Sequence, residues 1–273
     1  MNQKKSKIIS VINQKGGCGK TSTCFHLAGY FAKTGNRVLL VDADPQGSLS
    51  QAFFGSAFVE NLPAEKTMAA VLDPDVFVPE LPELTLPTNF ENIEIIPANR
   101  ELAKLNLPAE LSGSLEQFEL ASLLGSENGF DIVLIDCPPN LYQCSWNAVL
   151  ASEFVAIPLN ADDFGVQGLK VMLEAVELAT QIVPEVRLLG QFFTKFDRRI
   201  GLHREYECTL RRIYGSDVFQ TVVQEAAAFK MAVSNRKPVT HYSSWSRANR
   251  QIKSLGNEMM ERMQGHRNQQ KAA

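Results

Sequence analysis

Seven consecutive residues have the composition of a phosphate-binding loop. Residues 15–21 read Lys-Gly-Gly-Cys-Gly-Lys-Thr, directly after an apolar run and directly before a helical pattern. The glycines permit positive φ angles and let backbone N–H groups approach an anion, while the N-terminus of the following helix adds positive potential. In such a loop the second lysine reaches the β- and γ-phosphates, and the Thr21 hydroxyl binds Mg²⁺ directly. We therefore predict a nucleotide-binding segment made of Lys15, Gly16, Gly17, Cys18, Gly19, Lys20, Thr21 and Ser22.

The first lysine of the loop sets it apart from the generic phosphate-loop pattern. That pattern requires a glycine five residues before Gly19, where this chain has Gln14. Lys15, at the front of the loop, marks a deviant form of the motif.

Two acidic segments follow predicted strands. Asp42 ends the apolar run 37–42, Asp44 follows two residues later, and Asp136 ends the run 132–136. In open α/β sheets, ligands bind at the C-terminal edge of the parallel strands, where these carboxylates are expected. We predict that Asp136 holds Mg²⁺ through a water molecule and that Asp44 orients the attacking water. An isolated aspartate at a strand end is more often a turn former, so the prediction depends on the three motifs occurring together.

The elements that position these residues alternate along the chain. Short runs that are apolar on both faces, as in a buried parallel sheet, are interleaved with helical patterns. The alternation predicts an α/β fold with a doubly wound, mostly parallel sheet flanked by helices, as in a P-loop NTPase with a deviant Walker A loop, in one domain over residues 1–273. The predicted strands are 7–13, 37–42, 93–97, 132–136, 154–158, 188–193 and 218–223; the predicted helices are 20–34, 142–151, 166–182, 202–214 and 246–263.

Two segments fall outside that alternation. Residues 73–89 contain four prolines and little periodicity, so we interpret them as a surface excursion. Residues from about 264 onward form a polar tail that is expected to fray. In the helix before the tail, Ile252, Leu255, Met259 and Met263 form an apolar stripe that is typical of core packing.

The bulk composition is that of an ordinary globular protein, with 45% hydrophobic and 21% charged residues. No apolar run approaches the roughly 18 residues that span a bilayer, and no export signal is recognisable, so we expect a cytoplasmic protein. The five cysteines form no CxxC pair, which favours buried free thiols over disulfides or a zinc site.

Positive charge is concentrated in the last third of the chain. Residues 187–273 hold 16 Lys/Arg and 7 Asp/Glu, whereas residues 1–186 hold 11 and 23. This asymmetry suggests that a C-terminal face meets a polyanion, although a scattered, solvated set of charges is the simpler alternative.

Together these motifs resemble the ParA family of partition ATPases, within the wider ParA/MinD group with deviant Walker A loops. The resemblance runs from about residue 7 to residue 263 and is carried by segments 13–21, 41–47, 97–99 and 136–139, with Asn147-Ala148. It implies ATP and Mg²⁺ as cofactors and a homodimer that sandwiches the nucleotides. It also implies ATP-dependent binding to nucleoid DNA without sequence preference, and release after hydrolysis stimulated by a ParB-like adaptor or another cargo protein.

The resemblance implies specific roles for the catalytic residues. Lys15 would cross the dimer to the partner's phosphates, and would act there as an arginine finger does. Asp44 would position the water and Asp136 would organise the metal. Plasmid, chromosome and other cargo are equally compatible with these motifs.

The nucleotide-base and DNA-binding regions match the family only in part. Residues 222–226 replace the family's proline-arginine-asparagine stretch near the adenine, and residues 194–197 are either a base-side motif or a plain strand-end turn. Arg199 aligns with a basic position that the family uses on DNA, whereas the second such position is Ala228. Other basic residues lie close in sequence and are predicted to contact DNA with Arg199: Lys230, Arg236, Lys237, Arg247 and Arg250.

Two other kinds of ATPase are alternatives to this interpretation. A membrane-surface ATPase of the MinD kind needs a C-terminal amphipathic helix, but residues 264–273 contain no large apolar side chain, so no membrane partner is expected. An electron-transfer ATPase of the nitrogenase iron protein type needs paired cluster ligands, and the positions of Cys137 and Cys144 do not fit them.

Overall fold

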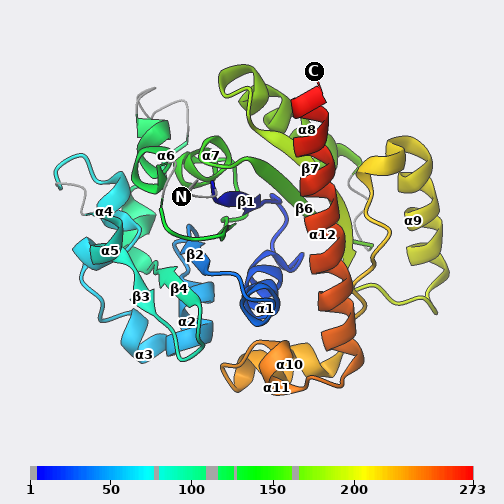
Figure 1. The fold of residues 1–273 in the computed structure, drawn as a ribbon, viewed down its shortest axis with the longest axis horizontal. Helices are drawn as coiled ribbons and strands as arrows, with labels where there is room; N and C mark the ends of the chain where they lie inside the picture. Colours follow the sequence, from blue (N-terminus) through cyan, green and yellow to red (C-terminus); the bar gives the residue numbers. More distant parts are fainter. Residues whose placement is uncertain (1–4, 77–79, 109–115, 126–127, 162–165, 273) are drawn as a thin grey trace.

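A single seven-stranded sheet organises the computed structural model, which describes residues 5–76, 80–108, 116–125, 128–161 and 166–272. The strand order is β3-β4-β2-β5-β1-β6-β7; every neighbouring pair is parallel except β3 with β4 (Figure 1). The strands are β1 (Lys7–Val11), β2 (Val38–Asp42), β3 (Leu86–Pro87), β4 (Ile93–Ile96), β5 (Ile132–Asp136), β6 (Phe154–Asn160) and β7 (Arg187–Thr194).

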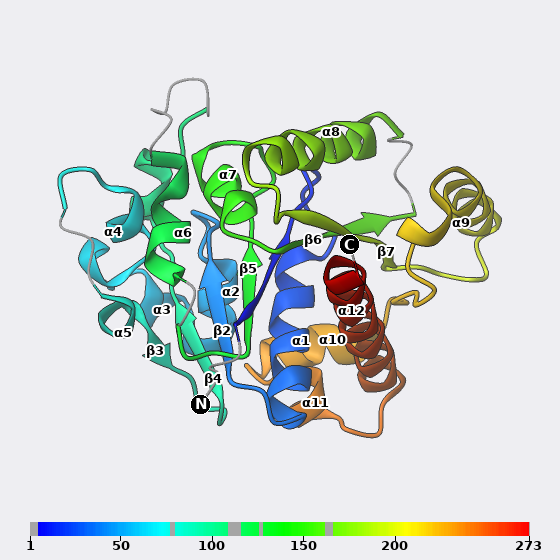
Figure 2. The ribbon, with the colours of Figure 1, turned by 45° about the horizontal axis from the view of Figure 1, so that its top comes forward.

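Helices cover both faces of this sheet and bury its apolar strands. One core cluster packs α7 and α8 against one face, and the other packs α1 and α12 against the opposite face (Figure 2). The α-helices are α1 (Lys20–Lys33), α2 (Ser48–Phe54), α3 (Ser56–Val59), α4 (Ala69–Leu72), α5 (Leu81–Leu84), α6 (Glu119–Leu124), α7 (Gln143–Leu150), α8 (Val166–Ile182), α9 (Gly201–Tyr214), α10 (Ala227–Ser234), α11 (Val239–Tyr242) and α12 (Arg247–Ala272). The predicted doubly wound α/β fold is confirmed.

The prediction of a strand at residues 218–223 is wrong. This segment makes only isolated bridges with the β7 region. Side chains of α12 bond several of its backbone groups: the Glu258 carboxylate accepts from the N–H groups of Gln220 and Thr221 at 2.7 and 2.8 Å. Arg262 also donates to the Val218 carbonyl at 3.1 Å. The N–H groups of Phe219 and Val223 still donate to the carbonyls of Gln191 and Phe193 in β7, both at 2.8 Å. The segment therefore runs beside β7, but because α12 side chains bond other backbone groups in it, it forms no regular strand.

Two further boundaries differ from the prediction. Within residues 73–89, interpreted as a surface excursion, the chain forms α5 and then β3, an antiparallel edge strand paired with β4. The last helix does not stop at residue 263 before a frayed tail, because the backbone of α12 stays helical to Ala272. Its predicted apolar stripe is buried in the core, as expected: Ile252, Leu255, Met259 and Met263 are at most 2% exposed.

Candidate nucleotide site

The predicted phosphate loop connects β1 to α1 and has the backbone geometry that its glycines permit. Gly17 and Gly19 have φ angles of 75° and 91°, in the left-handed region that favours glycine. Gly19 immediately precedes α1, so the loop ends at a helix N-terminus. The Thr194 hydroxyl, at the end of β7, donates to the Cys18 carbonyl at 2.6 Å. The loop is thereby anchored to the end of β7, two strands away from β1 in the sheet.

Lys20 is already held inside this loop. Its side chain is buried, and its Nζ donates to the carbonyls of Asn13 and Lys15 at 2.9 and 3.1 Å. An ammonium group has three protons, so one donor remains beyond these two bonds for a phosphate oxygen. The loop curls around Lys20, and the backbone of Lys15 is tied to the Asn13 side chain at 2.9 Å.

Two buried aspartates stand at the C-terminal edge of the sheet beside the loop. Asp42 on β2 pairs in register with Asp136 on β5. Burial, and next the charge of Asp42, raise the pKa of Asp136 well above its usual value. Neither Asp136 oxygen accepts a hydrogen bond of normal geometry from the described residues. The Thr21 hydroxyl lies close enough to lower that pKa in part. A buried acceptor without a donor, beside a threonine hydroxyl, fits water-mediated Mg²⁺ binding by Asp136 and direct binding by Thr21.

Asp42 was not assigned a role from the sequence, although it shares a motif with Asp44. Its carboxylate accepts from the Ser50 N–H and hydroxyl at 2.8 and 2.7 Å. Burial raises the pKa of Asp42 to about 7. Asp42 therefore holds the first turn of α2 through Ser50, and its negative charge raises the pKa of Asp136. A fully apolar strand that ends in two alternate aspartates is the signal that would have identified it.

Asp44 is half-buried and lies in a turn that fixes its backbone. Its N–H donates to the Asp42 carboxylate at 3.2 Å, and its own carboxylate accepts from the Gln46 N–H at 2.9 Å. Gly47 closes the turn with a φ of 61°, where any side chain would collide with the Ala98 carbonyl. The charge of Asp44 also raises the pKa of Asp136, although less than burial and the charge of Asp42 do.

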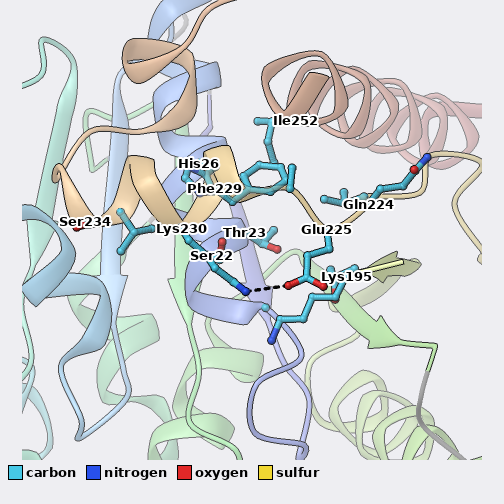
Figure 3. A pocket seen from close by; sticks show the side chains of 15 residues that line it. Ser22, Thr23, His26, Lys195, Gln224, Glu225, Phe229, Lys230, Ser234 and Ile252 are labelled. Atoms are coloured by element: carbon cyan, nitrogen blue, oxygen red, sulfur yellow. Dashed lines mark hydrogen bonds and ion pairs between the residues drawn. The ribbon is translucent and has the colours of Figure 1, made fainter. Parts of the chain in front are cut away.

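A cavity of about 500 Å³ opens beside the phosphate loop (Figure 3). It is bounded by α1, the end of β7, α10 and α12, together with residues 223–226. The Lys230 ammonium and the Glu225 carboxylate form an ion pair at 2.9 Å in its wall. A cavity of this volume, next to a phosphate loop, fits the base and ribose of a nucleotide.

The structure divides the segment 194–197 between two roles. Thr194 binds the phosphate loop and Lys195 lines the cavity. Asp197 is not part of the cavity wall, and it forms an ion pair with Arg199 at 2.6 Å. The first half of the segment therefore lines the cavity, and the second half is a strand-end turn.

His26 of α1 contributes a buried imidazole to the same cavity. Its Nδ1 accepts from the Val239 N–H at 3.1 Å, which places the ring proton on Nε2. Burial lowers the pKa of His26 to about 3, so the ring is neutral at pH 7. Its Nε2 has no partner among the described residues. The ring of Phe229 lies beside it, with centroids 5.0 Å apart.

The buried state of His26 predicts a pH-dependent stability. Because the folded-state pKa of about 3 lies below the ordinary 6.5, the unfolded chain binds more protons between these values. The contribution of neutral His26 to the free energy of unfolding is fully present above pH 6.5 and is lost as the pH falls toward 3. We expect His26→Asn to flatten this dependence by up to about 1.4 kcal/mol per pH unit, since its amide oxygen can still accept from Val239. Urea unfolding of both proteins at several pH values measures the difference; parallel curves would contradict it.

The six predicted DNA-contacting residues are all exposed, and five of them contact other residues. Arg199 is paired with Asp197, whose pKa it lowers strongly through their hydrogen bonds. Lys230 is paired with Glu225, and its hydrogen bond is the main cause that lowers the pKa of that carboxyl.

The other four predicted DNA contacts surround α10 and α11. Arg247 donates to the Gln224 side chain, and Arg250 donates to the Trp245 carbonyl at 2.9 Å. The Arg236 guanidinium packs against Gly55, although the residue is exposed. Lys237 is also exposed. Arg247 and Lys230 therefore bind Gln224 and Glu225, two residues that line the cavity. The sequence did not indicate these contacts.

The cysteines are free thiols, as predicted, and four of them are buried: Cys18, Cys24, Cys137 and Cys144. Burial raises the pKa of each of these four thiols. An iron–sulfur cluster shared between subunits needs cysteines at an exposed interface, which the buried Cys137 and Cys144 do not offer. Among the described residues, no group of three or more His, Cys, Asp or Glu is arranged to hold a metal ion by itself. None of the helices in those same residues is long and apolar enough to cross a membrane.

The fold, the phosphate loop and the paired aspartates define a P-loop nucleoside triphosphatase. A protein-family model described as an AAA domain matches residues 6–186. The chromosome-partitioning ATPase Soj of Thermus thermophilus is 32% identical over 261 residues, which cover 95% of this chain and 98% of Soj. The chromosome partitioning protein ParA of Caulobacter vibrioides is 28% identical over 261 residues, 94% of each chain. The chain belongs to the ParA/Soj/MinD family of P-loop ATPases.

Solved structures share this fold. Cobyrinic acid a,c-diamide synthase from Mycobacterium smegmatis, with a bound ATP analogue and magnesium, has a TM-score of 0.71 at 29% identity, over 85% of this chain and 91% of that one. Cyanothece McdA in its apo form has a TM-score of 0.78 at 21% identity, over 93% and 99% of the two chains. The second likeness concerns the fold alone.

Proposed function

We propose that this ATPase is a dimerising partition or cargo-positioning protein that binds non-specific DNA in its ATP state and leaves it after hydrolysis. The observation that carries the proposal is the pair of lysines in the phosphate loop. Lys20 is buried and bound inside its own loop, so it serves the nucleotide of its own subunit. Lys15, at the front of the loop, is the lysine for a second nucleotide, that of a facing subunit.

The proposed chemistry assigns one task to each side chain. Lys20 and the loop N–H groups bind the phosphates, and Thr21 and Asp136 hold Mg²⁺, which neutralises charge on the phosphate oxygens when bound. Asp44 orients the attacking water. Lys15 of the facing subunit stabilises the charge that develops on the γ-phosphoryl group. Hydrolysis then requires the dimer, and we expect it to be slow until a partner protein stimulates it.

The proposed DNA face uses the excess of positive charge in residues 187–273. Non-specific binding needs phosphate neutralisation and no base contact, so the number of available cations matters more than any single one. Dimer formation would double this number on one surface. The partners are then a second copy of this chain, nucleoid DNA in the cytoplasm, and a ParB-like adaptor or other cargo protein. The chromosome-partitioning names of Soj and ParA support this assignment.

A DNA-binding assay with ATP, ADP or no nucleotide tests this function. We expect binding to a random duplex only with ATP, and an affinity that falls steeply between about 50 and 200 mM salt because counterions are released. Lys237→Ala and Arg250→Ala should each remove about one phosphate contact. Each should therefore lower by about one the slope of the logarithm of the binding constant against the logarithm of the salt concentration. Lys170→Gln, on α8, removes an exposed lysine outside the proposed face and serves as the control. Equal binding without nucleotide, or binding insensitive to salt, would contradict the proposal.

A further inference from the structure

Trp245 exposes its side chain almost completely to water. It lies in the loop between α11 and α12 and is 90% exposed, the largest fraction among the large hydrophobic side chains of the described residues. The other tryptophan of the chain, Trp146 on α7, packs against one of the two core clusters. Tryptophan carries a large apolar surface, and exposed tryptophans are enriched where a protein binds a partner. Trp245 is therefore a candidate contact for a partner.

The backbone on both sides of Trp245 is fixed by hydrogen bonds. The Ser246 hydroxyl donates to the Ser243 carbonyl at 2.8 Å and accepts from the Asn249 N–H at 3.1 Å. The buried Asn249 amide donates to the carbonyl of the residue before Trp245. The Trp245 carbonyl itself accepts from the Arg250 guanidinium at 2.9 Å. Because the loop is held in this way, little conformational freedom is lost when the indole binds.

The charge around this loop favours a polyanion as the partner. Residues 226–257 contain six Lys/Arg and neither Asp nor Glu. Arg247 and Arg250, in the first turn of α12, are exposed, and Arg250 is bonded to the backbone of Trp245 itself. An indole beside arginines fits a partner that combines negative charge with flat rings, and a nucleic acid has both.

An acidic protein segment is the other occupant that these charges allow. Aromatic anchors of protein interfaces lie within a packed patch that excludes water around them. The other three residues between α11 and α12 are all serines: Ser243, Ser244 and Ser246. The loop itself thus gives the indole no apolar rim. The observations favour stacking on a base, which needs only the face of one ring.

We propose that Trp245 stacks on an unpaired base, so that this protein binds DNA with unpaired bases more tightly than an intact duplex. The inference deepens the DNA binding proposed above and rests on it. In a duplex the face of each base is covered by its neighbours, and an indole reaches one only where the stack opens. The cations near Trp245 meet phosphates in both kinds of DNA, so they add affinity without this preference.

The test compares two labelled duplexes of equal length, one intact and one with a short central bubble of unpaired bases, in the presence of a non-hydrolysable ATP analogue. The wild type should bind the bubble duplex about tenfold more tightly, as for one stacked base. Trp245→Ala should bind both duplexes with the wild-type affinity for the intact one. Its salt dependence should be unchanged, because no cation is removed. Ile213→Ala, which truncates a 53% exposed side chain on α9, is the control and should keep the preference.

Tryptophan fluorescence reports the contact directly. Trp146→Phe leaves Trp245 as the single tryptophan of the chain, and this variant should bind both duplexes as the wild type does. Its emission should be quenched strongly by the bubble duplex and much less by the intact duplex, because a base stacked on an indole quenches its fluorescence.

The outcomes separate the role of Trp245 from the DNA binding on which it rests. If the wild type binds neither duplex, both proposals are wrong. If it binds the two duplexes equally, or if Trp245→Ala keeps the preference, DNA binding stands and the role of Trp245 is overturned. Unquenched emission on a bound bubble duplex would also overturn that role, and would favour an acidic protein segment as the partner of this loop.

Discussion

Lys15→Gln is expected to abolish ATP turnover while the nucleotide stays bound. The side chain that holds the phosphates of its own subunit is Lys20, whose Nζ is fixed by two loop carbonyls. Glutamine keeps much of the length of Lys15 but removes its charge, which is the property that stabilises a departing phosphoryl group. We expect the rate of hydrolysis to fall by about 10³-fold or more, as when an arginine finger is lost.

A second variant separates this effect from a loss of binding. Lys20→Gln should lose nucleotide affinity itself, because the buried ammonium and its contact with the phosphates disappear together. Lys15→Gln should bind ATP with nearly wild-type affinity by calorimetry and should show almost no phosphate release. Full turnover in Lys15→Gln would remove this residue from the mechanism.

Asp44→Asn is expected to trap the ATP state. The asparagine oxygen can still accept from the Gln46 N–H, so the turn is retained while the carboxylate charge is lost. Without that charge the attacking water is poorly oriented and its proton is not accepted, and we expect hydrolysis to fall by about 10²–10⁴-fold. DNA binding with ATP should persist for much longer than in the wild type.

The matched control for Asp44 is its exposed neighbour. Gln46→Ala leaves the Asp44 carboxylate in place, and should hydrolyse ATP at nearly the wild-type rate. Phosphate release and DNA retention are measured on the same samples. Rapid hydrolysis by Asp44→Asn would show that another group orients the water.

The sequence was sufficient for the parts of this protein that are set by local pattern. The strands on either side of the phosphate loop are apolar on both faces because helices cover both, so β1, β2, β5 and β6 follow from composition alone. The loop follows from its glycines, since Gly17 and Gly19 have the positive φ angles that the motif requires. Asp136 follows from its place at the end of a buried strand.

Features set by distant contacts were not predictable. Residues 218–223 have the apolar pattern of a strand, but Glu258 and Arg262, about forty residues later, bond the backbone groups of Val218, Gln220 and Thr221. The sequence leaves Lys195 between a base-side motif and a plain strand-end turn, and the structure places its Nζ 3.9 Å from the position of a Cβ on Gly17. Likewise His26 lies in an apolar helix, and its buried, neutral state depends on Val239. These contacts join segments that are remote in the chain, and residue patterns do not record them.

Sedimentation velocity of Asp44→Asn with a labelled random duplex tests the central proposal most directly, with ATP in one cell and ADP in the other. The chain has a mass of 30.3 kDa. With ATP, the protein alone should sediment as a species of twice that mass, and the duplex should move with it. With ADP, the protein should sediment as a monomer and the duplex should remain unbound. A monomer at saturating ATP, or a duplex bound equally in both cells, would contradict the proposal that the ATP-bound dimer is the DNA-binding form.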